Sequence, residues 1–148
     1  MKALQLKEKR RVLSLFTSGS VNRKLENILA NKSAGLELEN VNDTNKASSL
    51  LKHFKYNTIV CDVDKWIASK SSRNMYEFFQ NNYSKQSAYW LFVTNPENKD
   101  HLVDFVAKDK CDYVVYPCKD AFLASKFNSV LTSYESQEKK SKQSSSPA

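Results

Sequence analysis

The stretch Tyr56–Asp64, which reads YNTIVCDVD, decides how the rest of this chain is interpreted. Its centre, Thr58–Cys61, is uncharged and mostly β-branched or small, and it leads directly into the carboxylate of Asp62. A strand inside a parallel sheet has this pattern, because both of its faces are buried until the chain leaves the sheet. Ligand sites of open α/β sheets lie at that carboxyl edge. We therefore expect Asp62 to lie at the mouth of a crevice.

The remaining chain alternates between two kinds of apolar pattern. Continuous or alternating apolar residues predict four further strands, at 12–16, 36–41, 89–94 and 112–116. Apolar residues at helical spacing predict five helices, at about 21–32, 47–54, 75–83, 102–106 and 122–131. Residues 66–74 are polar and predict no element. Strands that alternate with helices in this way predict a parallel sheet with helices on both faces.

The net charge of +7 is concentrated in the ends of the chain. Residues 1–11 carry five basic side chains and one acidic one, and residues 136–148 carry three basic and one acidic. The intervening segment, 12–135, holds 15 basic and 14 acidic side chains and is almost neutral. A folded domain that binds nucleic acid carries positive charge on its own surface. We therefore expect no nucleic-acid partner.

The length of 148 residues predicts one domain. We expect a charged N-terminal extension or connector at 1–11, the folded domain at 12–135 and a disordered tail at 136–148. The tail is composed mainly of Ser, Gln and Lys, which bury too little apolar area to offset the entropy of ordering.

Two features of the sequence bear on its compartment. No apolar run approaches the roughly 20 residues that span a bilayer, and the charged N-terminus lacks the apolar segment of a signal peptide. The cysteines, Cys61, Cys111 and Cys118, are odd in number and lack CxxC spacing, so we expect reduced thiols. These features favour a cytoplasmic protein without membrane contact.

Three segments together resemble the response-regulator receiver (CheY-like) family. Asn57–Asp62 (NTIVCD) resembles the strand that carries the family's phospho-accepting Asp. Trp90–Thr94 (WLFVT) resembles the strand that ends in its Ser/Thr, and Cys111–Pro117 (CDYVVYP) resembles its D-Y-[LV]-V-K-P segment. The resemblance covers about residues 12–133. It implies a single (βα)5 flavodoxin-like domain, a doubly wound parallel sheet with strand order 2-1-3-4-5.

The sequence departs from the family where the chemistry occurs. Thr17 and Ser18 stand where the family has two acidic residues that hold a divalent metal, and Tyr116 stands where it has a phosphoryl-binding Lys. Lys65 and Trp66 occupy the region where the family places a Pro. Phosphoryl transfer to a carboxylate depends on cations that offset the negative charge, and neutral hydroxyls are poor substitutes. The resemblance therefore implies a degenerate, pseudo-receiver domain that binds no metal and needs no cofactor.

The matched positions define a candidate pocket around Asp62, a vestigial phospho-acceptor. Asp62 is also interpreted as a structural acid that accepts hydrogen bonds from loop amides or Ser18, and Thr94 as a cap of the following helix. Asp64 could rebuild a cation site together with Asp62, and Glu97 and Asp100 are alternative candidates for such a site. The complete candidate pocket is Thr17, Ser18, Asp62, Asp64, Thr94 and Tyr116.

Three classes of function follow. The favoured one is a non-enzymatic signalling module that binds a protein, either a histidine kinase or another domain of a larger sensor. Its expected interface is Phe105, Tyr113 and Phe122, around the last strand, through which we also expect homodimerisation. The alternative is a working receiver, phosphorylated at Asp62 by a histidine kinase or phosphotransfer protein in the presence of Mg²⁺. A third class, an unrelated small α/β enzyme or nucleotide binder, lacks a phosphate loop and a nucleophile–base pair.

Overall fold

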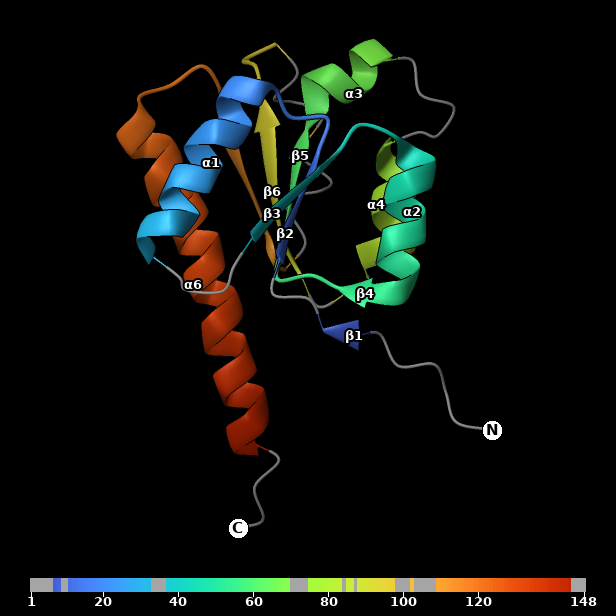
Figure 1. The fold of residues 1–148 in the computed structure, drawn as a ribbon, viewed down its shortest axis with the longest axis vertical. Helices are drawn as coiled ribbons and strands as arrows, with labels where there is room; N and C mark the ends of the chain where they lie inside the picture. The colour runs from blue at the N-terminus through green and yellow to red at the C-terminus, as the bar shows by residue number, and fades with distance from the viewer. Residues whose placement is uncertain are drawn as a thin grey trace.

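The structure is a computed structural model that describes residues 7–8, 11–32, 37–69, 75–83, 85–86, 88–97, 102 and 109–144. Its centre is a five-stranded parallel sheet (Figure 1). The strands of this sheet are β2 (Arg11–Leu15), β3 (Glu37–Val41), β5 (Thr58–Asp62), β6 (Tyr89–Thr94) and β7 (Cys111–Val115). They lie in the order β3-β2-β5-β6-β7, which confirms the predicted order 2-1-3-4-5 when these strands are counted along the chain.

Helices cover both faces of the sheet, as predicted (Figure 1). On one face lie α1 (Gly19–Lys32) and α6 (Asp120–Ser144), which contact each other. On the other lie α2 (Thr44–His53), α3 (Val63–Ser69) and α4 (Met75–Tyr83). The central strands are buried on both faces because the helices cover both, which explains the continuous apolar run in β5.

Alternate side chains of each strand supply two separate cores. In β5, Val60 packs with the core beneath α1 and α6, whereas Ile59 and Cys61 pack with the core beneath α2, α3 and α4. The core beneath α2, α3 and α4 is rich in aromatic rings. In this core the ring centroids of Phe79 and Trp90 are 5.0 Å apart. This alternation follows from the two-residue period of a strand. It also determines which face each residue near the carboxyl edge can reach.

The sequence pattern did not predict helix α3. It begins at Val63, directly after β5, and covers part of the segment 66–74 for which no element was expected. Trp66 is only 3% exposed, and its ring centroid lies 5.0 Å from both Phe16 and Phe78. Val63 and Trp66 are one helical turn apart and both enter the same core. The buried aromatic ring therefore anchors a seven-residue helix whose remaining residues are largely polar.

The ends of the chain differ from the expected boundaries. The sequence predicts disorder from residue 136, but α6 continues to Ser144 as one helix of 25 residues, and its last turns extend beyond the sheet (Figure 1). No Gly or Pro interrupts this segment, and Glu, Gln and Lys have good helix propensity. At the other end, β1 (Lys7–Glu8) pairs in parallel with β4 (Phe54–Lys55), so part of the expected connector joins a small second sheet.

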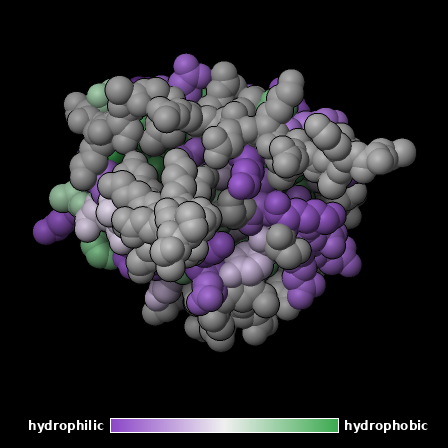
Figure 2. Space-filling view, turned by 90° about the horizontal axis from the view of Figure 1, so that it is seen from below, coloured by the Kyte–Doolittle hydropathy of each residue, from purple (hydrophilic) through white to green (hydrophobic). Residues whose placement is uncertain are grey.

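The surface view and the helices bear on what this molecule can contact. Seen from below in Figure 2, the described residues that reach this end of the molecule are mostly hydrophilic. Within the described part of the chain, no helix combines the length and the apolar character that a membrane span requires. The predicted helix at 102–106 and its interface residue Phe105 lie outside the described residues, apart from Leu102, which is buried.

Candidate functional site

Asp62 ends β5 and is 8% exposed. Its Oδ1 accepts a hydrogen bond from the backbone amide of Lys65 at 2.9 Å, within the first turn of α3. Burial raises the pKa of Asp62, while the amide of Lys65 lowers it less and the nearby charge of Asp64 raises it further. The carboxylate therefore acts as a cap for α3, and its position matches the carboxyl edge expected from the sequence.

Asp64 and Thr94 lie together at the same edge of the sheet. Thr94 ends β6 and is fully buried, and its hydroxyl lies 3.4 Å from Oδ1 of Asp64. The same hydroxyl lies 3.1 Å from the carbonyl oxygen of Asn95. A hydroxyl donates one hydrogen, so it is directed to one of these two acceptors at a time. The structure thus brings two of the predicted pocket residues into contact beside Asp62.

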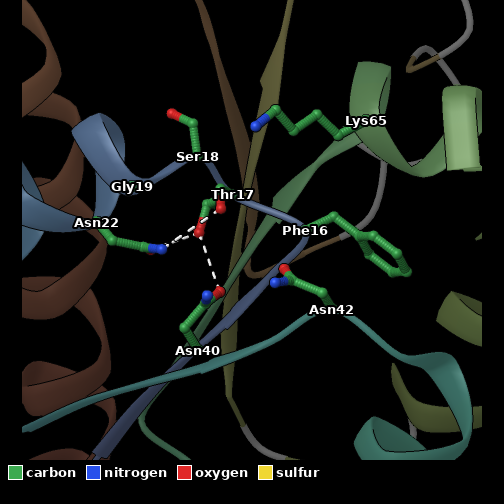
Figure 3. A pocket seen from close by; sticks show the side chains of 8 residues that line it. All are labelled: Phe16, Thr17, Ser18, Gly19, Asn22, Asn40, Asn42 and Lys65. Atoms are coloured by element: carbon green, nitrogen blue, oxygen red, sulfur yellow. Dashed lines mark hydrogen bonds between the residues drawn. The ribbon is translucent and has the colours of Figure 1, made fainter.

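Thr17 and Ser18 make hydrogen bonds with residues of α1 and β3, and within the described structure neither is hydrogen-bonded to Asp62. The Thr17 hydroxyl donates to the side-chain oxygen of Asn22 and lies 3.4 Å from that of Asn40 (Figure 3). The Ser18 hydroxyl accepts from the backbone amide of Val21 at 3.3 Å and so caps α1. The two residues matched to the family's acidic pair therefore serve α1 and β3.

Phe16 was missed as a site residue because the sequence assigns it to the first strand. The strand ends at Leu15, and Phe16 has a left-handed backbone with φ of 63°. Strand alternation would direct its ring toward α1, but the turned backbone directs it to Trp66 on the opposite face. A positive φ is strained for a bulky residue. An apolar ring thus lies next to the position matched to the acidic pair.

Tyr116 does not join Asp62. It follows β7 on the face that is covered by α1 and α6, and its hydroxyl accepts from Nζ of Lys24 at 3.1 Å. Lys24 also pairs with Asp120 at 2.8 Å, and the hydrogen bonds from Lys24 to Asp120 and Tyr116 raise the pKa of this lysine above its ordinary value. No motif in the sequence signals this cluster, because it joins α1 to the start of α6.

A cavity of about 480 Å³ opens beside the Asp62 site. It is lined by residues 16–19 after β2, Asn22 of α1, Asn40 and Asn42 at the end of β3, and Lys65 of α3 (Figure 3). Thr17 and Ser18 are the predicted pocket residues that line it. The three asparagines and Lys65 were not identified from the sequence, where isolated Asn residues at strand ends are typical of loops and caps.

The predicted interface residues Phe122 and Tyr113 differ from each other in exposure. Phe122, in the first turn of α6, is 50% exposed. Tyr113 of β7 is partly buried against the aromatic core beneath α2, α3 and α4.

Among the described residues, no three His, Cys, Asp or Glu side chains are grouped in a way that could hold a metal ion.

Solved structures share this fold over most of the chain. An adenylate cyclase from Rhodopirellula baltica is similar with a TM-score of 0.72 and 14% identity, covering 94% of this chain and 99% of that one. The signal receiver domain of a putative LuxO repressor protein from Vibrio parahaemolyticus has a TM-score of 0.68 and 14% identity, over 88% and 95% of the two chains.

A CheY-like response regulator receiver domain protein from Methanospirillum hungatei has a TM-score of 0.62 and 17% identity, over 90% of this chain and 99% of that one. No family model and no curated protein matches the sequence. The chain therefore has the fold of response-regulator receiver domains, as its three resembling segments imply. Because fold alone does not determine function, the function has to be inferred from the residues of the site.

Proposed function

We propose that this chain is a signalling module with a receiver fold that binds a protein partner and is not regulated by phosphorylation. The observation that carries the proposal is the state of Asp62. Its carboxylate is buried and is hydrogen-bonded to the amide of Lys65 at 2.9 Å. A carboxylate that caps a helix in this way has a structural role that does not depend on phosphorylation.

The surroundings of Asp62 support the same conclusion. Attack by the carboxylate on a phosphoryl group would require a cation to offset the charge of the reacting oxygens. At the positions matched to the family's metal ligands, the hydroxyls of Thr17 and Ser18 are neutral and turned toward α1 and β3. Tyr116, which replaces the family's Lys, lies on the opposite face and binds Lys24. The side chains present do not fit a magnesium site of the family's kind.

The partner surface that we propose includes the start of α6. Phe122 exposes half of its surface there, and aromatic residues are enriched at the centres of protein interfaces. The partner is a histidine kinase or another domain of a larger sensor protein, or a second copy of this chain. The proposed module is cytoplasmic and not an enzyme, and it contacts neither nucleic acid nor membrane.

The test is an NMR titration of the wild-type domain with Mg²⁺, with and without beryllofluoride as a phosphoryl analogue. We expect no saturable shifts of the Asp62 and Thr94 amides below about 10 mM Mg²⁺, a range in which weak cation sites respond. Saturation in that range would show a functional pocket and would overturn the proposal.

One observation favours the second candidate, a receiver that is phosphorylated at Asp62. The hydroxyl of Thr94 lies 3.4 Å from Asp64, so a second carboxylate stands at the same edge and could supply a cation ligand. Incubation with acetyl phosphate and Mg²⁺, followed by intact-mass measurement, distinguishes the candidates. Addition of one phosphoryl group that is lost in Asp62→Asn would establish the second candidate.

A further inference from the structure

We propose that the cavity between β2, β3 and α3 is a binding site for a small phosphate-bearing molecule, held without any covalent bond. This inference goes beyond the proposed function and does not rest on it, because Asp62 is not among the residues that line the cavity. A ligand bound there would give a receiver fold an input that needs no phosphoryl transfer.

The cavity lies at the carboxyl edge of the sheet, beside β2. The chain leaves β2 toward β3 on one side and later enters β5 on the other side of β2. The carboxyl ends of these strands therefore form the crevice at which open α/β sheets bind ligands. Lining residues come from the end of β3 and from the segments that follow β2, β3 and β5. The cavity volume of about 480 Å³ is within the usual range for small-molecule sites.

The lining of the cavity is positively charged and rich in hydrogen-bonding side chains. None of the eight lining residues is acidic, and Lys65 supplies a positive charge. Figure 3 shows its ammonium group reaching from α3 toward Ser18, across the cavity from Asn40 and Asn42. Lys65 is also fixed at its backbone, because its amide donates to the carboxylate of Asp62. A cavity with one ammonium and no carboxylate favours an anion over a cation.

A hydrogen-bond network orients the side-chain amides of Asn22 and Asn40. Asn22 is 8% exposed, and its Nδ2 donates to the carbonyl oxygen of Thr17 at 3.3 Å, so its Oδ1 faces the nearby hydroxyls. Ser14 and Thr17 together have two hydroxyl hydrogens for the two oxygens of Asn22 and Asn40. Because Thr17 donates to Asn22, Ser14 can donate to Asn40 at 3.0 Å.

The consequence is that the side-chain oxygen of Asn40 accepts the hydrogen bond from the Ser14 hydroxyl. Its NH₂ group, which can only donate, remains for a ligand. Asn40 is itself exposed, so this donor is accessible. The amide of Asn40 and the ammonium of Lys65 therefore face one cavity as donors, an arrangement suited to the several acceptor oxygens of a phosphate group.

The experiment is an NMR titration with inorganic phosphate, compared with sodium chloride at equal ionic strength. We expect saturable shifts of the Ser18, Gly19 and Asn40 amides at about millimolar phosphate. Lys65→Met keeps most of the side-chain length but removes the charge, and should raise the dissociation constant by about tenfold or more. Asn40→Asp keeps the acceptor for Ser14 but replaces the donor with a negative oxygen, and should abolish binding.

Two control variants test whether phosphate binds in this cavity and not elsewhere on the surface. Lys52→Met removes an exposed lysine near the end of α2 and should leave the dissociation constant unchanged within about twofold, since distant surface charges are screened. Lys85→Met, at an exposed lysine that follows α4 and does not line the cavity, should likewise leave the dissociation constant unchanged within about twofold. The proposal is overturned by a lack of saturation at about 100 mM phosphate, or by weakening in Lys52→Met or Lys85→Met equal to that in Lys65→Met.

Discussion

Trp66→Ala is the substitution that most directly tests how the Asp62 edge is built. The indole is 3% exposed and packs between Phe16 and Phe78, with ring centroids 5.0 Å away on each side. Truncation of a buried Trp to Ala costs about 3–5 kcal/mol, because the transferred surface is lost and a cavity remains. This is a large share of the roughly 5–15 kcal/mol by which a domain of this size is stable.

Two assays measure the loss of stability in Trp66→Ala. Urea denaturation followed by circular dichroism should give a free energy of unfolding lower by about 3–5 kcal/mol, with an unchanged slope if unfolding stays two-state. The melting temperature should fall by about 6–20 °C, since each kcal/mol shifts a domain of this length by about 2–4 °C. Lys65→Ala, the exposed neighbour on α3, is the matched control and should change stability by less than about 0.5 kcal/mol.

A small effect of Trp66→Ala would contradict this account of α3. A loss below about 1 kcal/mol, similar to an average surface change, would mean that the indole does not anchor α3. In that case α3 would be only loosely attached to the core. The cap that Asp62 provides and the position of Lys65 would then not depend on this ring.

Three further predictions concern the carboxylate, the C-terminal end and the interface. Because burial raises the pKa of Asp62, the stability that this carboxyl group contributes is present below its unfolded pKa of about 3.9 and is lost as the pH rises through its folded pKa. The urea midpoints of the wild type and Asp62→Asn should therefore converge near pH 3, and at pH 7 the variant should have the higher midpoint. Equal midpoints at both pH values would contradict this. Deletion of 136–148 should leave the melting temperature nearly unchanged, and a loss of several degrees would show that the end of α6 docks. Phe122→Ser should weaken partner binding or self-association while changing stability by less than about 0.5 kcal/mol, and partner-induced chemical shifts confined to β3 would exclude this interface.

The layers of the fold could be predicted from the amino-acid pattern. The uncharged run before Asp62 indicated a strand buried on both faces, and β5 is that strand. The alternation of strands with helices predicted a parallel sheet, because parallel strands require crossover connections. The carboxyl edge was also predictable, since it depends only on where apolar runs end. In these cases the decisive interactions repeat every two or four residues and are visible as a pattern.

Which side chains meet at that edge could be learned only from the folded chain. Phe16 faces Trp66 because of a single left-handed φ, which no periodicity encodes. Tyr116 meets Lys24, although 92 positions separate them in the chain, because α1 and α6 cover the same face of the sheet. Helix α3 is too short for a periodic signal, and it is stabilised by one buried ring. Lys65 and Asn40 come to one cavity from separate connections, so their shared site exists only in the folded chain.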